Sequence, residues 1–306
     1  MSDLAPHLDD ATIAVCGATG KQGGAVARVL ADRGVRVVAL TRTPESDPAR
    51  ALAAAGMTVR RADLLDPASL EAAFEGVWGV FGMTTPFNAD YTKCDTEAEQ
   101  RQGFNLVDAC AASGVSHLVL TTVLDFDDGP SIVPYINSKR EVERHLERSG
   151  VRYTLLQPGA FMEEIGGMDF TIRKGKVRGS CARDARVPSV ATEDIAAAAK
   201  MAFEDPERFA GETLPLIADY CSGHDLVETL ERMREGERFK YSTYPLLLVR
   251  IFAPLVYPLR VTMERWSRSE RAEDLQRACE RFRALRPDAL TVERYLQREG
   301  WATRSW

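Results

Sequence analysis

The chain has 306 residues, of which 45% are hydrophobic and 27% are charged, so it is long enough and apolar enough to bury a large core. Its net charge of −6 argues against a nucleic-acid-binding protein. The six cysteines are scattered without a C-x-x-C pair, so neither a disulfide framework nor a metal site is expected. The acids and proline of residues 1–10 do not resemble a signal peptide, and we expect a cytoplasmic protein without a transmembrane segment.

A glycine-rich turn lies between the first predicted strand and the first predicted helix. The apolar run at residues 13–16 is typical of a buried strand, and residues 25–31 have the apolar spacing of a helix. Gly17, Gly20 and Gly23 form a G-x-x-G-x-x-G pattern between them. Glycine lets the backbone approach a pyrophosphate closely, and the helix start offers free N–H groups. The motif predicts a dinucleotide site, and its alternative is a tight turn without a ligand.

The residues after the second predicted strand indicate which dinucleotide is bound. This strand covers residues 35–40, and an acid directly after it would bind the ribose hydroxyls of NAD. Arg42 follows instead, and a guanidinium can bind a 2′-phosphate through charge-assisted hydrogen bonds. Lys21 would add a second positive charge. We therefore predict NADP(H) in preference to NAD(H), the alternative being that Arg42 is a solvated loop cation.

Strands and helices continue to alternate along the chain. The sequence predicts strands at 57–64, 77–83 and 117–122, and helices at 67–74 and 97–113. Such alternation is typical of an α/β fold with a doubly wound parallel sheet, which binds ligands at the carboxyl ends of its strands. The residues expected in this crevice are 17–23, Arg42, Asp63, 84–87 and 121–123.

Tyr135 and Lys139 form a Y-x-x-x-K pattern at the start of a helix that we expect to run to about Arg148. Positions i and i+4 share one helical face, so the phenol and the ammonium are expected to be neighbours. A nearby cation lowers the pKa of a tyrosine, which suits a proton donor to a carbonyl that receives hydride. The hydroxyl of Thr122 would hydrogen-bond the same substrate oxygen. The alternative is a buried tyrosine beside a surface lysine.

Residues 17–24 (GATGKQGG) resemble the glycine motif of the NmrA-like atypical short-chain dehydrogenases/reductases. The resemblance extends over residues 11 to 245. It implies an NAD(P)-binding Rossmann domain at 10–160, completed by about 187–219, and a smaller, mostly helical substrate-side domain at 161–186 and 220–306. The further segments that carry it are 40–42, 62–64, 105–109, 114–119, 138–139, 157–163, 194–196 and 236–241.

The same resemblance implies where NADP(H) is bound. The glycine turn would hold the pyrophosphate, Arg42 the 2′-phosphate and Lys139 the nicotinamide ribose. Adenine would rest at Asp63 and Leu64, where a simple helix-approach turn is an equal alternative. The complete set of expected cofactor residues is Gly17, Thr19, Gly20, Lys21, Gln22, Gly23, Arg42, Asp63, Leu64, Thr85, Pro86, Lys139, Pro158, Gly159 and Phe161.

A small apolar substrate is expected beside the cofactor. The aromatic and methionine residues that would line its pocket also suit ordinary core packing, which is the alternative for several of them. They are Phe87, Tyr91, Phe126, Met162, Met168 and Phe170.

The family that the sequence resembles spans NADPH-dependent quinone, enone and dye reductases, and it also includes regulators that bind the cofactor without turnover. Many members carry another residue where this chain has Tyr135, so the tyrosine–lysine pair favours an enzyme. We predict an NADPH-dependent reductase that transfers hydride to an apolar carbonyl, quinone, enone or imine, with Tyr135 as proton donor and Lys139 as its partner. The alternatives are a non-catalytic NADP(H)-sensing regulator and an NAD-retaining epimerase or isomerase.

Two stretches of the C-terminal half are not explained by this function. Residues 173–186 are rich in arginine and lysine, which indicates an exposed hairpin. Residues 245–258 are the most apolar stretch of the chain, interrupted by Arg250, Pro254 and Pro258, and they are too short to span a bilayer. Plain burial is the simplest expectation for this stretch. A pocket cover, a membrane-touching segment or the face of a homodimer are its alternatives.

Overall fold

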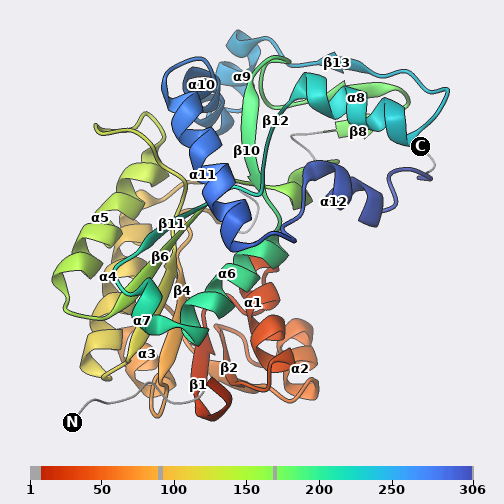
Figure 1. Ribbon diagram of the computed structural model, residues 1–306. Helices are drawn as coiled ribbons and strands as arrows, with labels where there is room; N and C mark the ends of the chain where they lie inside the picture. Colours follow the sequence, from red (N-terminus) through yellow and green to blue (C-terminus); the bar gives the residue numbers. More distant parts are fainter. Residues whose placement is uncertain (1–7, 89–91, 168–170, 305–306) are drawn as a thin grey trace. The chain divides into compact units, whose positions relative to one another are not determined.

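The computed structural model describes residues 8–88, 92–167 and 171–304 (Figure 1). Among these residues, no helix has the length and apolar character needed to cross a membrane. The chain divides into two compact units. Unit 1 comprises Met1–Val123, Pro134–Gln157 and Ile195–Leu214, and unit 2 comprises Leu124–Val133, Pro158–Asp194 and Pro215–Trp306.

Unit 1 is built around a seven-stranded sheet with the strand order β11-β6-β5-β4-β1-β2-β3, in which β1 to β6 pair in parallel. The central strands are buried along their length because helices cover both faces of the sheet. The chain order reverses between β1 and β4, which makes this point the topological switch of the sheet. The predicted fold class is therefore confirmed. The strands are β1 (Thr12–Val15), β2 (Arg36–Thr41), β3 (Thr58–Arg61), β4 (Gly79–Met83), β5 (His117–Thr121), β6 (Tyr153–Pro158) and β11 (Thr213–Leu216).

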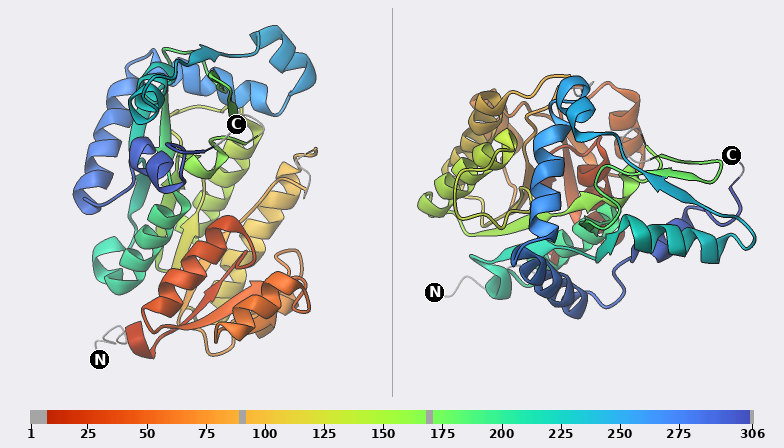
Figure 2. Two further views of the ribbon diagram at one scale, coloured as in Figure 1. Left: turned by 90° about the vertical axis from the view of Figure 1, so that its right-hand side faces the viewer. Right: turned by 90° about the horizontal axis from the view of Figure 1, so that it is seen from above.

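The helices of unit 1 form two layers, one on each face of the sheet (Figures 1 and 2). One layer holds α1, α2 and α6, and a salt bridge of 3.2 Å between Arg33 and Glu204 joins the ends of α1 and α6. The other layer holds α3, α4 and α5. Here α4 and α5 pack closely because a side chain at Gly103 would collide with Val142. The helices are α1 (Lys21–Asp32), α2 (Asp47–Ala54), α3 (Pro67–Ala73), α4 (Thr96–Ala112), α5 (Pro134–Arg148), α6 (Thr192–Glu204) and α7 (Pro206–Phe209).

Unit 2 contains two three-stranded sheets, β12-β10-β7 and β13-β9-β8, together with helices. Its apolar core includes Ile217, Trp266 and Leu275. The strands are β7 (Ala160–Phe161), β8 (Thr171–Arg173), β9 (Lys176–Arg178), β10 (Arg186–Val190), β12 (Asp219–Ser222) and β13 (Lys240–Ser242). The helices are α8 (Gly223–Met233), α9 (Leu246–Phe252), α10 (Val256–Ser267), α11 (Arg271–Leu285) and α12 (Val292–Arg298), and short 3-10 turns lie at Leu8–Asp10 in unit 1 and at Met162–Glu164.

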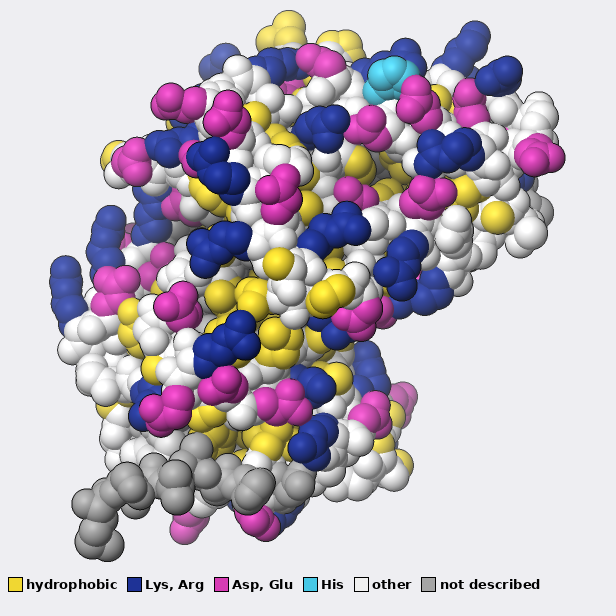
Figure 3. Space-filling model, in the orientation of Figure 1, with side chains coloured by type: hydrophobic (Ala, Val, Ile, Leu, Met, Phe, Trp, Pro, Cys, Tyr) yellow, Lys and Arg dark blue, Asp and Glu magenta, His cyan; other side chains and the backbone are white. Residues whose placement is uncertain are grey.

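The expectation of plain burial for residues 245–258 is wrong for α9. Leu247, Ile251 and Phe252 expose 67%, 59% and 80% of their surface, and Val249 is the buried residue of this helix. Figure 3 shows hydrophobic side chains over α9 at the upper edge of the view. Apolarity alone predicts burial. However, α9 is a helix of seven residues, and the rest of unit 2 covers only the side that carries Val249.

Candidate functional site

The glycine turn after β1 needs glycine for two distinct reasons. Gly17 has a positive φ of 62°, a backbone conformation that a side chain disfavours. At Gly23 a Cβ atom would collide with the carbonyl oxygens of Cys16 and Gly17. Helix α1 therefore starts directly against the turn. Its N-cap, Gly20, offers no side-chain cap, and its first turn contains no acid, so the N–H groups there suit an anionic group.

Gln22 connects this turn to the neighbouring part of the sheet. Its Nε2 atom donates a hydrogen bond of 2.8 Å to Oγ1 of Thr121 at the end of β5, and both side chains are buried. The side chain therefore positions the turn, and its predicted contact with a cofactor stays a prediction. Thr19 and Lys21 lie in the same turn and are exposed.

Arg42 directly follows β2 and is exposed. Among the residues that the structure describes, it forms neither a salt bridge nor a side-chain hydrogen bond, which leaves its guanidinium available for an anion. Asp63 is half-buried, and its Oδ1 atom accepts a hydrogen bond of 2.9 Å from the backbone N–H of Leu65. The backbone oxygen of Leu64 accepts one of 2.9 Å from Asn105. These hydrogen bonds fit the alternative given for Asp63, an acid in the turn before a helix. Its predicted contact with adenine stays a prediction.

Lys139 lies in a buried polar cluster and not on the surface. Its Nζ atom lies 2.7 Å from Oε1 of Glu99 and donates to Oγ1 and the backbone oxygen of Thr84 at 3.2 and 3.3 Å. Thr84 also donates to Glu99 at 3.1 Å, and the hydroxyl of Ser138 donates to the other carboxylate oxygen. Glu99 is completely buried. The cluster joins the end of β4 to α4 and α5.

The predicted effect of Lys139 on Tyr135 is wrong in this structure. The pKa of Tyr135 is raised, mainly because burial disfavours the phenolate and further because Cys94 and Glu99 lie nearby. Both side chains are described, and no hydrogen bond joins them. Glu99 neutralises the lysine, and the ring of Tyr135 packs edge-on against Phe87 with 5.5 Å between ring centroids. A raised pKa keeps the phenol protonated at neutral pH.

Thr122 has a different hydrogen-bond partner from the one expected. Its hydroxyl donates to Oε1 of Glu143 on α5, and Nε2 of Gln157 donates to the same oxygen at 3.1 Å. The hydroxyl proton is therefore engaged within the protein, and donation to a substrate oxygen would require this bond to break. Its catalytic role stays a prediction.

The loop after β4 contains the next group of expected contacts. The backbone N–H of Thr85 donates to Oε1 of Gln102 at 3.1 Å, and Oγ1 of Thr85 accepts from the backbone of Phe87 at 3.2 Å. Pro86 is buried and Thr85 is exposed. Tyr91, expected in the substrate pocket, lies outside the described residues.

The remaining expected residues belong to unit 2. A Cβ atom at Gly159 would collide with the backbone oxygen of Pro188, so this glycine is needed for close packing against β10. Phe126 packs edge-on against Trp266 with 6.1 Å between ring centroids, and Met162 is completely buried, so both have the core role given as the alternative. Pro158 is buried and Phe161 half-buried, whereas Met168 and Phe170 lie outside the described residues.

Glu99 is the residue that the sequence reasoning missed. It occupies the apolar stripe of α4, in line with Gly103, Leu106 and Cys110, which are all buried. An acid on the buried side of a helix requires a cation as partner. The buried side of α5 supplies one at Lys139, so the two helical patterns read together would have found the pair.

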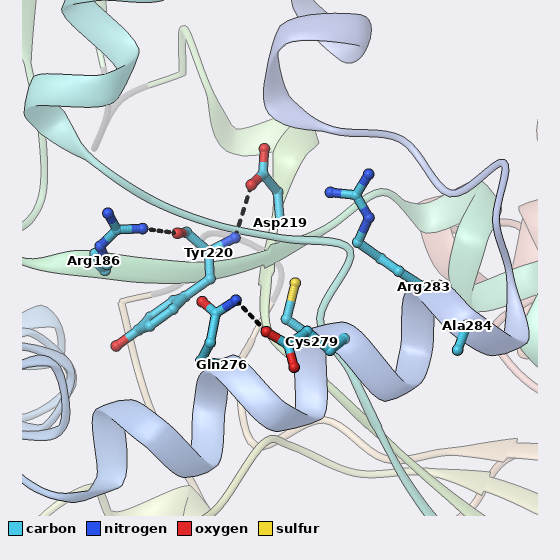
Figure 4. A pocket seen from close by; sticks show the side chains of 8 residues that line it. Arg186, Asp219, Tyr220, Gln276, Cys279, Arg283 and Ala284 are labelled. Carbon is cyan, nitrogen blue, oxygen red and sulfur yellow. Dashed lines mark hydrogen bonds between the residues drawn. The ribbon is translucent and has the colours of Figure 1, made fainter.

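A pocket of about 540 Å³ lies within unit 2 (Figure 4). Arg186 on β10 donates a 2.9 Å hydrogen bond to the backbone oxygen of Tyr220 on the neighbouring strand β12, and Asp219 accepts one of 2.9 Å from the Tyr220 backbone. Burial raises the pKa of Cys279 in its wall to about 11, which disfavours a reactive thiolate. None of the expected cofactor or substrate residues lines this pocket.

The sequence also matches a known family. The model of the NmrA-like family matches residues 9–296. The chain belongs to the NmrA-like family. The predicted resemblance is thereby confirmed over nearly the whole chain.

Three proteins illustrate what this chain is similar to. The NmrA-like family domain-containing oxidoreductase notA of Aspergillus sp. (strain MF297-2) is 27% identical over 253 residues, 75% of each chain. Quinone oxidoreductase 2 of Escherichia coli (strain K12) is 33% identical over 192 residues, 61% of this chain and 62% of the relative. The crystal structure of NmrA, a negative transcriptional regulator, in complex with NADP covers 94% of each chain at 21% identity with a TM-score of 0.75.

Proposed function

We propose that this member of the NmrA-like family is an NADPH-dependent reductase of a small apolar carbonyl, quinone, enone or imine. The observation that carries the proposal is the carboxyl edge of β1, β2 and β4, which are neighbours in the sheet of unit 1. This edge carries the glycine turn, the exposed Arg42 and the buried Lys139 cluster. The curated relatives described above are named oxidoreductases.

NADP(H) fits the residues at this edge. Gly17 and Gly23 allow a tight turn directly against α1, because a Cβ atom there would collide with Met83 or with the carbonyl oxygens of the turn. Helix α1 therefore presents its uncapped N–H groups at this turn, where a pyrophosphate would bind. Arg42 would bind the 2′-phosphate, and Lys139, held by Glu99 and Thr84, would bind the ribose hydroxyls. When bound, the dinucleotide supplies the hydride. The preference for NADP(H) over NAD(H) rests on Arg42 and on the lack of an acid directly after β2.

Tyr135 is the proposed proton donor. Its raised pKa keeps the phenol protonated, so it is ready to donate but is a weak acid. A weak acid suffices for the strongly basic oxygen that reduction of a ketone creates, and it helps little with the less basic oxygen of a reduced quinone. We therefore infer that the need for Tyr135 depends on the substrate class.

The test is the consumption of NADPH with ketones, enones and quinones by the wild type, Tyr135→Phe and the control Tyr153→Phe. We expect ketone turnover to fall at least about a hundredfold in Tyr135→Phe, with NADPH binding retained and with quinone turnover and the control nearly unchanged. Ketone turnover that survives in Tyr135→Phe would remove this residue from the mechanism.

A second candidate function is a redox-sensing regulator. The Lys139–Glu99 pair favours it, because a neutralised lysine leaves Tyr135 without the activation that the spacing predicts. This candidate predicts tight NADPH binding with no turnover on any substrate in the panel. An epimerase that retains NAD predicts instead a purified protein with bound NAD and no net consumption of cofactor.

A further inference from the structure

The sheet of β13, β9 and β8 has one face that carries cations and small hydroxyl side chains. In each strand the two outer residues are exposed and the middle residue is covered. Arg173 pairs with Lys176, and Lys176 pairs with Lys240, in the register of the three strands. Three positive side chains therefore lie in one row across the sheet.

This row has no negative partner within the described part of the chain. Arg173, Lys174, Lys176 and Lys240 form no salt bridge with any residue that the structure describes. Like charges directly opposite each other on neighbouring strands repel and destabilise a sheet. Residues 238–263 also contain no acid, although the whole chain is negative. An extended anionic partner would relieve the repulsion within such a row of cations.

Helix α9 follows β13 in the chain and presents an apolar surface. Leu247, Leu248, Ile251 and Phe252 occupy positions i, i+1, i+4 and i+5, which share one helical face. All four are exposed, although they are large hydrophobic side chains. Figure 3 shows hydrophobic side chains over α9 and Lys or Arg side chains along the same upper edge of the view.

Tyr244 fixes the helix relative to the sheet within unit 2. The guanidinium of Arg178 on β9 lies 4.5 Å from the centroid of the Tyr244 ring and donates a hydrogen bond of 2.8 Å to its hydroxyl. The buried Arg260 of α10 donates one of 2.6 Å to the backbone oxygen of Tyr244, and Glu264 holds Arg260 at 2.9 Å. These contacts tie the loop before α9 to β9 and α10 within unit 2.

We propose that this basic-apolar surface, formed by the exposed faces of β8, β9, β13 and α9, docks on an anionic lipid bilayer. The cations would meet lipid phosphates while the side chains of α9 enter the boundary of the acyl chains. A nucleic acid would leave the apolar side chains in water. A symmetric dimer through this face would bring the cations of two copies together. The inference does not depend on the proposed reductase activity.

Vesicle flotation of the full chain tests this proposal. Vesicles of phosphatidylglycerol mixed with phosphatidylcholine are compared with vesicles of phosphatidylcholine alone. We expect binding to the anionic vesicles that weakens as salt is added, and much weaker binding to the neutral ones. NADPH oxidation without vesicles is measured in parallel, so that a failure of docking is distinguished from a failure of the enzyme.

Two double variants separate the contributions. Leu247→Ser/Phe252→Ser and Lys176→Gln/Lys240→Gln should each lower vesicle affinity about tenfold or more, since all four side chains are exposed and their replacement leaves the core intact. Leu65→Ser and Arg148→Gln, exposed positions of unit 1, are the controls and should bind as the wild type does.

Three results would overturn the proposal. The first is a wild type that does not float with anionic vesicles. The second is an α9 variant that floats as well as the wild type, which would indicate a purely electrostatic partner such as a nucleic acid. The third is a wild-type dimer that the α9 substitutions dissociate without any effect on vesicle binding, which would assign this face to a second copy of the chain.

Discussion

The Nζ atom of Lys139 lies 2.7 Å from Oε1 of Glu99, and both residues are buried in unit 1. Removing these charges from water is costly, and their mutual attraction together with the hydroxyls of Thr84 and Ser138 offsets the cost. The pair fixes the ammonium group in one place. It also neutralises that group, which explains why Lys139 does not lower the pKa of Tyr135.

Replacing one partner of this pair should destabilise the protein strongly. Glu99→Gln leaves the ammonium of Lys139 buried without its counter-charge, and we expect the free energy of unfolding to fall by about 3–5 kcal/mol. Glu99→Gln/Lys139→Met removes both charges and should recover much of this loss. Urea unfolding of the wild type, both single variants and the double variant gives the coupling energy. If the loss of stability in the double variant equals the sum of the losses in the two single variants, the prediction is wrong.

Arg42→Ala should weaken NADP(H) binding far more than NAD(H) binding. A guanidinium that binds a phosphate contributes about 1.5–3 kcal/mol, so we expect the Kd for NADPH to rise about tenfold to a hundredfold. The Kd for NADH should change little, because NADH lacks the 2′-phosphate. Fluorescence titration measures both constants. Arg61→Ala, another exposed arginine in unit 1, is the control, and an equal loss for both dinucleotides in Arg42→Ala would rule out the assigned contact.

The fold of unit 1 could be predicted closely from the sequence. The apolar runs at 13–16, 35–40 and 117–122 correspond to β1, β2 and β5 within one residue at each end. The central residues of these strands are buried on both faces, so they are apolar and the limits of each run are sharp. The helix predicted at 67–74 corresponds to α3, which Asp66 caps by accepting a hydrogen bond from the backbone of Ser69. The division into domains stays a prediction.

The candidate site could be predicted only in part. The spacing of residues within one helix does not show which residues of other helices they contact. The Y-x-x-x-K pattern places Tyr135 and Lys139 on one helical face, but the partner of the lysine lies forty residues earlier on α4. In the same way, the apolarity of residues 245–258 says nothing about how much of unit 2 is available to cover α9. Both errors concern which surface a side chain meets, which depends on tertiary packing.

Gly23→Ala should destabilise unit 1 and weaken NADPH binding together. The added methyl group would collide with the carbonyl oxygens of Cys16 and Gly17, so α1 must move away from the turn. Overpacking of this kind costs about 1–3 kcal/mol, and the N–H groups that suit the pyrophosphate move with the helix. Thermal unfolding and NADPH titration measure the two effects. Gly129→Ala, where an added Cβ atom meets nothing within 4 Å, is the control. A Gly23→Ala protein with wild-type stability and affinity would contradict the close approach.

His117 provides a pH dependence of stability. This residue starts β5 and is completely buried, and its Nε2 lies 2.9 Å from the hydroxyl of Thr154. That hydroxyl donates to the backbone oxygen of Phe209, so it accepts from Nε2 of a neutral ring. Nδ1 has no hydrogen-bond partner among the described residues. Burial, with a further contribution from the charge of Arg152, lowers the pKa of His117 to about 4.

Between pH 6.5, the ordinary pKa of histidine, and about pH 4, the unfolded chain therefore binds a proton at His117 and the folded chain does not. The free energy of unfolding should fall as the pH falls through this window, by about 3 kcal/mol in full, and should not change on this account above it. Urea unfolding near neutral pH and at about pH 4.5 measures the slope. His117→Gln retains a donor for Thr154 and should lose this contribution, whereas the control His145→Gln, on the partly exposed side of α5, should keep it. An unchanged slope in His117→Gln would show that other groups cause the acid sensitivity.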